Sequence, residues 1–300
     1  MSCARRGGDR HSLGLLGEDI VVATPDGRRL RGVLAGTGDD LVVLEAGLGG
    51  SGLTWGPVLE RVARTSRVLA YDRAGLGSSD PDPAPRDLER LADDLEAVVA
   101  SVPHRRLVLA GHSWGGPIVR VVASRRIARG DDTLGVVLAD PSDERAHAYA
   151  SSTTRFAFGV QAALLVPLAR TGLLRPLHRI ALAGLPRPVL TAASDAAGSV
   201  AAARATAAEQ RHVLPGLAAL AAPTRTLPGV PVRIVSGTGT GRLARLQRAD
   251  LVRAHRASAD AFEQGGWLPA PRSAHMVPVT DPEVVASAVA ELLGRRVAPD

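Results

Sequence analysis

The residues around Ser113 have the types and the spacing of a catalytic nucleophile. The stretch from Val108 to Gly116 reads VLAGHSWGG and contains the pattern Gly-x-Ser-x-Gly. An apolar run precedes the serine, and a helix-compatible run, 117–128, follows it. On such a strand–turn–helix unit the serine hydroxyl stands above the sheet edge, and the glycines let the strand and the helix approach closely. This context predicts a nucleophilic serine rather than a chance match in a glycine-rich chain.

The elements that position the serine alternate between strands and helices. Apolar runs that predict strands lie at 19–24, 28–34, 41–45, 67–71, 107–110, 134–139, 230–236 and 261–268. Helical patterns lie at 55–64, 86–101, 117–128, 242–257 and 282–293. This alternation predicts a mostly parallel sheet with helices on both faces, and Ser113 lies at the carboxyl end of a central strand.

These features resemble the α/β-hydrolase fold, in its group with a serine nucleophile. The resemblance extends over about residues 18–293. It implies a mostly parallel central sheet flanked by helices, with a helical cap inserted between the sixth and seventh strands. We expect a flexible leader at 1–17, a core at 18–140 and 229–300, and the cap at 141–228.

A glycine-rich loop follows the strand predicted at 41–45. In the family this loop usually begins with His-Gly, and the residue after the glycine donates its backbone N–H to an oxyanion. Here Ala46 replaces the histidine, whereas Gly47 and Leu48 match. Because the donor belongs to the main chain, the resemblance implies that Leu48 and Trp114 form the oxyanion site. A plain flexible loop is the alternative.

The predicted general base is His275, which lies in a Ser-x-His-Met-x-Pro context before the closing helix. This context resembles the loop that carries the family's base, and an imidazole titrates near neutrality. We expect His112 to pack or hydrogen-bond, with its side chain directed away from the serine hydroxyl. The other histidines lack metal-ligand spacing, so no metal is expected. Asp281 is the expected N-cap of the closing helix.

The acid that orients the histidine is the least certain member of the site. Most family members carry it in the loop that here spans 236–241, which has neither Asp nor Glu. Some carry it after the strand that follows the nucleophile helix, where this chain has Asp140. We favour Asp140; Asp143, Glu144 and no acid at all are the alternatives. A further residue, Asp72, begins a loop that resembles Asp-Arg-x-Gly-x-Gly-x-Ser, and we expect it to be a structural hydrogen-bond acceptor.

The segment 141–228 has alanine- and leucine-rich helical runs broken by prolines. Its apolar side chains could line an acyl pocket, or form ordinary core between cap and sheet, which we favour; a membrane-touching cap is a third alternative. The side chains concerned are Phe156, Phe158, Leu164, Leu165, Leu173, Leu174 and Leu177.

Composition narrows the possible partners and the location. The net charge is +6, and all 36 basic residues are arginines. Because they are interleaved with Asp and Glu, they predict a solvated surface rather than a nucleic-acid interface. The single cysteine, Cys3, fits a reducing cytoplasm, and the N-terminal residues lack the apolar run of a secretory signal. The most apolar stretch, 156–169, is too short for an integral membrane segment.

The expected function is hydrolysis of an ester or another acyl compound through an acyl intermediate on Ser113, without a cofactor. The expected partner is a small, apolar acyl substrate; the oligomeric state is open. A serine at position 113, in place of aspartate, argues against epoxide-hydrolase or dehalogenase chemistry. The alternatives on the same site are a carbon–carbon bond hydrolase, an acyltransferase and a cofactor-free haloperoxidase. A non-catalytic binding protein is the alternative of another class.

Overall fold

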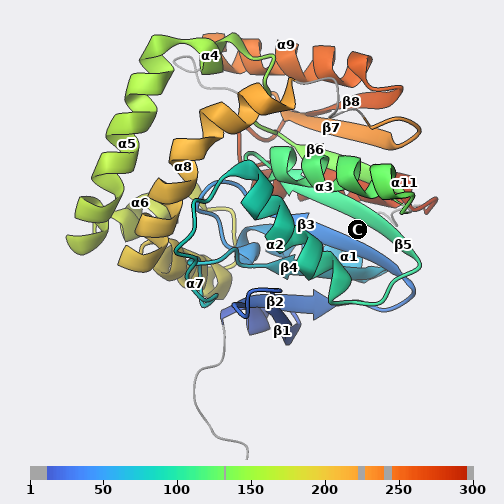
Figure 1. The fold of residues 1–300 in the computed structure, drawn as a ribbon, viewed down its shortest axis with the longest axis horizontal. Coiled ribbons are helices and arrows are strands. Elements are labelled where there is room, and N and C mark those ends of the chain that lie inside the picture. Colours follow the sequence, from blue (N-terminus) through green and yellow to red (C-terminus); the bar gives the residue numbers. More distant parts are fainter. Residues whose placement is uncertain (1–11, 132, 222–226, 240–244, 296–300) are drawn as a thin grey trace, which may run out of the picture.

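The central element is an eight-stranded sheet with the order β1-β2-β4-β3-β5-β6-β7-β8 (Figure 1). The computed structural model describes residues 12–131, 133–221, 227–239 and 245–295. The strands are β1 (Glu18–Ala23), β2 (Arg29–Ala35), β3 (Asp40–Glu45), β4 (Arg67–Tyr71), β5 (Arg106–His112), β6 (Gly135–Ala139), β7 (Pro231–Gly237) and β8 (Gln264–Ala270). Strand β2 is antiparallel to both β1 and β4, and the other pairs are parallel. The predicted α/β-hydrolase sheet is therefore confirmed.

Helices cover both faces of this sheet. Those packed on it are α1 (Gly56–Ala63), α2 (Leu88–Ala100), α3 (Gly115–Arg129), α9 (Arg245–Ala261) and α11 (Pro282–Leu292). Short turns of helix are η1 (Ser12–Leu15), η2 (Gly52–Trp55) and α10 (Val277–Thr280). Of the leader expected at 1–17, residues 1–11 lie outside the described part, and 12–15 form η1.

The core has two halves, one on each face of the sheet. In β5, Leu107 and Leu109 pack into the half that contains α2 and α3. Their neighbours Val108 and Ala110 pack into the half that contains α1 and α11. Because successive strand residues point to opposite faces, a central strand buried on both sides must be continuously apolar. The apolar runs were therefore a reliable guide to the buried parallel strands. The strand expected at 261–268 instead runs from Gln264 to Ala270, because residue 261 still belongs to α9 and this edge strand is only partly buried.

The chain between β6 and β7 forms helices, and no strand occurs in its described residues. They are α4 (His147–Ala150), α5 (Ser152–Arg170), α6 (Leu174–Ala181), α7 (Arg187–Ala197) and α8 (Val200–Leu220). Ser151 and Ser199 begin α5 and α8 as N-caps, because each hydroxyl accepts a hydrogen bond from a backbone N–H of the first turn. Figure 1 shows α5 to α8, coloured green to gold, gathered to the left of the sheet.

The expectation for the apolar side chains of this segment is wrong at several positions. Leu165 and Leu174 are buried, but they pack with Ala169, Ala203 and Ala207, that is, among the helices of the segment itself. Four of the seven are exposed: Phe156, Leu164, Leu173 and Leu177. The reason is that α5 packs on α8 with one side only. Its other side therefore contributes neither to the core nor to a pocket.

Asp281 occupies the N-cap position of α11 and Pro282 its first turn, as expected. The side chain of Asp281 makes no capping hydrogen bond, however, and instead pairs with Arg272, whose nitrogen lies 2.8 Å away.

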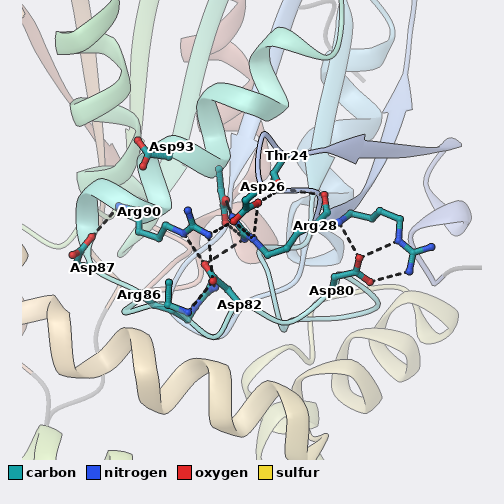
Figure 2. A network of polar contacts seen from close by, with 12 residues as sticks. Thr24, Asp26, Arg28, Asp80, Asp82, Arg86, Asp87, Arg90 and Asp93 are labelled. Carbon is teal, nitrogen blue, oxygen red and sulfur yellow. Dashed lines mark hydrogen bonds and ion pairs between the residues drawn. The ribbon is translucent and has the colours of Figure 1, made fainter.

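Many surface arginines pair with carboxylates. Figure 2 shows one such network, in which Arg28 contacts Asp26 and Asp82. Arg28 also pairs with Asp94 of α2, with 2.7 Å between nitrogen and oxygen. Hydrogen bonds from Thr24 and Arg28 lower the pKa of the Asp26 carboxyl. The network ties the β1–β2 hairpin to the helix beside it.

Among the described residues, no single helix is long and apolar enough to cross a membrane. Helices α5 and α6 meet the length and hydropathy requirements only as a pair, and this pair is bent by 112°.

Candidate active site

Ser113 lies on the turn between β5 and α3, in left-handed backbone with φ 52°. Few non-glycine residues adopt this conformation, and it is common where the fold holds a functional side chain in a fixed position. A Cβ on Gly111 would lie 2.3 Å from the carbonyl oxygen of Gly115, and one on Gly115 would lie 2.4 Å from that of Glu45. The two glycines are therefore needed for the strand and the helix to meet at Ser113.

Asp140 directly follows β6 and is fully buried, also with positive φ, 46°. Its Oδ2 accepts hydrogen bonds from His275 Nδ1 at 2.6 Å and from an Arg248 nitrogen at 2.7 Å. Its Oδ1 accepts one from the Gly237 N–H at 3.0 Å. Burial raises the pKa of the Asp140 carboxyl, but the hydrogen bond and charge of His275, with the charge of Arg248, bring it below its ordinary value. Asp140 is therefore a carboxylate at neutral pH.

The other carboxylates considered from the sequence have different partners. Asp143 accepts from the N–H of Arg145 at 2.8 Å. Glu144 pairs with Arg120 at 2.7 Å, on the outer side of α3. Asp250, the first carboxylate after the loop at 236–241, accepts from a backbone N–H of α4. Of these four carboxylates the structure brings Asp140 alone next to His275. Residues 240 and 241 of that loop lie outside the described residues.

His112 supports the loop that carries His275. It is buried, and its Nε2 lies 2.9 Å from the carbonyl oxygen of His275, so this nitrogen must carry the proton and donate. Burial, aided by the nearby His275, lowers the pKa of His112 to about 3. The imidazole of His112 is therefore neutral and hydrogen-bonds the backbone of the loop that carries His275, in agreement with the expectation.

The glycine-rich loop lies beside Ser113 and is held by a buried arginine. Arg73 donates to the carbonyl oxygens of Ala46 and Gly47, at 2.6 and 2.8 Å. Among the described residues, no acceptor is found for the N–H of Leu48. This N–H, next to the serine and without an internal partner, is free to bind a ligand atom.

Arg73 itself lies between two buried carboxylates. It pairs with Glu45 at the end of β3, at 2.6 Å, and with Glu209 of α8, at 2.8 Å. Arg86 pairs with the same Glu209 at 2.6 Å. Burial raises the pKa of the Glu209 carboxyl, but the two arginines bring it below its ordinary value. The ion pairs connect α8 to the loop at the site. The neighbouring Asp72 accepts from Ser51 and Gly52 and is structural, as expected.

A cavity of about 460 Å³ opens over Ser113 and His275. Leu48 and Trp114 line it from the sheet side. Helices between β6 and β7 close it from the other side, with the residues Tyr149, Phe158, Gln161, His178, Ala181, Leu182, Ala193, Ala197 and Val213. Burial lowers the pKa of His178, which makes it a neutral hydrogen-bonding group in a largely apolar wall. Of the seven apolar residues singled out from the sequence, Phe158 alone lines this cavity.

Several residues of the site had no signal in the sequence. Glu209 and Arg248 meet their partners, Arg73 and Asp140, only in the folded chain. His178 and Gln161 lie on helices whose inner side the sequence did not reveal. A larger cavity, of about 700 Å³, lies near α1 and α11, and no serine or histidine lines it. Among the described residues there is no group of three His, Cys, Asp or Glu side chains that could hold a metal.

Comparison with known proteins places the chain in a family. Residues 41–288 match the model of the alpha/beta hydrolase family. "Putative carbamate hydrolase RutD" of Rhizobium rhizogenes is 36% identical over 86 residues, which are 28% of this chain and 33% of that protein. The protein of the same name from Yersinia enterocolitica is 42% identical over 78 residues, 26% of this chain and 28% of that one. The matches therefore span about a third or less of these relatives' length.

Solved structures share the fold over nearly the whole chain. A thermophilic esterase from Thermogutta terrifontis superposes with a TM-score of 0.70 at 19% identity, covering 93% of this chain and 98% of the esterase. The enol-lactonase from Burkholderia xenovorans gives a TM-score of 0.64 at 18% identity, covering 92% and 100%. Because the sequence identities are only 19% and 18%, these superpositions show a shared fold alone. Since the family model covers most of the sequence, the chain belongs to the alpha/beta hydrolase family.

Proposed function

We propose that this protein hydrolyses an ester or a related acyl compound by way of an acyl intermediate on Ser113. The observation that carries the proposal is the 2.6 Å hydrogen bond from His275 Nδ1 to Asp140. It fixes the tautomer, so that Nε2 is the nitrogen that can take the proton of Ser113. Both Ser113 and His275 line the same cavity.

The proposed reaction has two halves. Ser113 Oγ attacks the substrate carbonyl carbon while His275 takes the hydroxyl proton, and the carbonyl π electrons move to the oxygen. The N–H groups of Leu48 and Trp114 stabilise this oxyanion, and α3 adds the positive end of its dipole. The C–O bond to the leaving group then breaks, and His275 gives its proton to the departing oxygen. Water then attacks the acyl carbon while His275 takes its proton; the bond from this carbon to Ser113 Oγ breaks, His275 returns the proton to Oγ, and the acid is released.

The carboxylate beside His275 stabilises the imidazolium that forms in each half. Asp140 supplies a full negative charge in a buried position, where charge interactions are strong. Arg248 and the N–H of Gly237 hold this carboxylate and remain in place when the proton moves. No cofactor is needed for these steps.

The cavity supports a small acyl substrate with apolar groups. The surface of its walls is mainly apolar, and Gln161, His178 and Tyr149 offer polar contacts at a few points. In this proposal the helices at 141–228 form a cap domain on the core at 18–140 and 229–300. The chain's single cysteine supports a cytoplasmic location.

A carbamate is a second candidate substrate. The relatives named as carbamate hydrolases are 36% and 42% identical over their matched segments. A carbamate presents a carbonyl carbon to the same nucleophile, so both candidates use the same site chemistry. Parallel assays with p-nitrophenyl esters and carbamates would distinguish them.

The test of the proposal compares three carboxylate variants: Asp140→Asn, Asp143→Asn and Glu144→Gln. An amide at 140 keeps the shape but favours the wrong imidazole tautomer, an effect of order ~10⁴ on turnover in a serine protease. We expect turnover of a p-nitrophenyl ester to fall by orders of magnitude in Asp140→Asn alone. Parental turnover in that variant, or an equal loss in Asp143→Asn, would contradict the proposal.

A further inference from the structure

The outer sides of α5 and α6 carry large apolar side chains that no described residue covers. On α5 these are Phe156, Val160 and Leu164, and on α6 and the residue before it they are Leu173, Leu177 and Ile180. The spacings of four, and of four and three, put each set on one side of its helix. We call these six residues the outer stripe. Phe156 and Ile180 are each 75% exposed, far beyond what a core position shows.

The outer stripe is separate from the core of the segment. The opposite side of α5 packs on α8 through Leu165 and Ala169. Figure 1 shows α5 at the edge of the molecule, with α8 between it and the sheet. Clustered exposed apolar side chains of this size are uncommon on monomeric proteins and mark surfaces that bind something.

Positive charges predominate around the outer stripe, although Arg175 of α6 pairs with Asp195 of α7 at 2.9 Å. From Arg145 to Ser194 the sequence contains no Asp or Glu, although the whole chain has 30. Three exposed arginines in this stretch, Arg155, Arg170 and Arg179, have no carboxylate partner among the described residues. Elsewhere arginines alternate with carboxylates, as in the network of Figure 2. The helical segment that carries the outer stripe therefore exposes both apolar side chains and unpaired arginines.

This combination favours a lipid surface over a second copy of the chain. Anionic headgroups attract arginines, and apolar side chains on the same surface enter the acyl boundary below them. A second copy that presented the same surface would instead bring unpaired arginines close to each other without any carboxylate. The helices fit a surface position rather than a crossing one, because α5 and α6 are bent by 112° at their junction.

We propose that the outer stripe and its arginines bind the surface of a membrane containing anionic phospholipid. The same two helices line the cavity with their other sides, through Phe158 and Gln161 of α5 and His178 of α6. Binding would therefore place the walls of the cavity next to the bilayer. The proposal does not depend on the chemistry at Ser113.

The test is sedimentation of the full chain with vesicles, either of phosphatidylcholine alone or with a third of phosphatidylglycerol. We expect binding to the anionic vesicles, weakened by salt because charge screening acts on exposed groups. Phe156→Asp with Leu164→Asp should reduce the bound fraction at least ten-fold. The matched control is Val21→Asp, at an exposed apolar position of β1 that is 51% accessible; it should bind like the parent.

The arginines are tested separately. Replacing Arg155, Arg170 and Arg179 by Gln, one at a time, should weaken binding about five-fold each, which corresponds to about 1 kcal/mol per charge near an anionic surface. Ser113→Ala should bind vesicles as the parent does, so that loss of catalysis and loss of binding are told apart. Equal sedimentation with and without vesicles of either kind would overturn the proposal. A dimer in solution that Phe156→Asp dissociates, with no vesicle binding, would assign the surface to a second copy and also overturn it.

Discussion

Arg248 and His275 hydrogen-bond the same atom, Oδ2 of Asp140, at 2.7 and 2.6 Å. The same Arg248 nitrogen also lies 2.6 Å from the carbonyl oxygen of Ala274, the residue before the histidine. Arg248 therefore holds both the acid and the backbone of the loop that carries the base. We regard it as a positioning residue of the candidate site.

Replacing Arg248 by Met should lower turnover and change its dependence on pH. The charge of Arg248 helps keep the pKa of Asp140 below its ordinary value, so its removal should raise that pKa. The charged carboxylate stabilises the imidazolium of His275, and the acid limb of the profile is set by the pH at which these two interacting groups together take up a proton, which loss of a nearby positive charge makes easier. The acid limb of the kcat profile should therefore move to higher pH in Arg248→Met. Arg253→Met, on the same helix and 52% exposed, is the control and should keep the parental profile. If kcat falls in Arg248→Met but the acid limb does not shift, the role of Arg248 is structural only.

Glu209 should be important for stability because it is buried between Arg73 and Arg86. Glu209→Gln leaves two buried guanidinium groups without their full counter-charge. Removing one partner of a buried ion pair costs about 3–5 kcal/mol. Urea unfolding measures this loss. The control is Asp195→Asn, which removes an exposed ion pair with Arg175 and should cost less than about 1 kcal/mol of unfolding free energy. If the two variants are equally stable, the ion pairs of Glu209 with Arg73 and Arg86 do not stabilise the packing of α8 on the rest of the protein.

The sequence revealed the local parts of the site better than its long-range parts. The setting of Ser113 is contained in nine consecutive residues, and β3 and β5 are recognisable because they are buried on both faces. Arg248 meets Asp140 across 108 residues of chain, and Glu209 meets Arg73 across 136. Neither pair has a local pattern, because each depends on where separate helices pack.

The prediction for the apolar side chains between β6 and β7 was wrong at several positions for a related reason. Helical spacing shows which residues share a side of α5, but both of its sides are apolar. The side that packs is decided by the position of α8 rather than by the sequence of α5. Asp140 was favoured as the acid because 236–241 contain neither Asp nor Glu, and the structure places it next to His275.

The neutral, buried His112 should make the protein less stable in mild acid. Its pKa is lowered to about 3 in the fold, whereas in the unfolded chain it lies near 6.5. Below the unfolded value the unfolded state takes up a proton that the folded state does not, so stability falls as the pH drops from about 6.5 toward 3. Between pH 7 and pH 5 this contributes about 2 kcal/mol. The measurement is urea unfolding of the parent and of His112→Gln at pH 7 and at pH 5. The loss of unfolding free energy between the two pH values should be smaller in the variant by about 2 kcal/mol.

Gly115→Ala should damage the turn at Ser113. The new Cβ would lie 2.4 and 2.7 Å from the carbonyl oxygens of Glu45 and Ala46. Backbone cannot move aside as a flexible side chain can, so we expect a loss of about 3 kcal/mol in unfolding free energy and of most activity. Gly159→Ala in α5, where a Cβ meets nothing within 4 Å, is the control and should stabilise slightly, since alanine favours a helix. Similar unfolding midpoints for the two variants would contradict the close approach seen at Ser113.

The most direct test of the central claim is covalent labelling of Ser113 by a fluorophosphonate probe, read by intact mass and peptide mapping. The account predicts that the folded parent gains one probe adduct, that the adduct maps to Ser113, and that labelling abolishes turnover of a p-nitrophenyl ester. Ser113→Ala should fold normally, remain unlabelled and lose turnover. If the folded parent stays unlabelled, or if Ser113→Ala keeps turnover within a few-fold of the parent, Ser113 is not the nucleophile and the proposed mechanism is wrong.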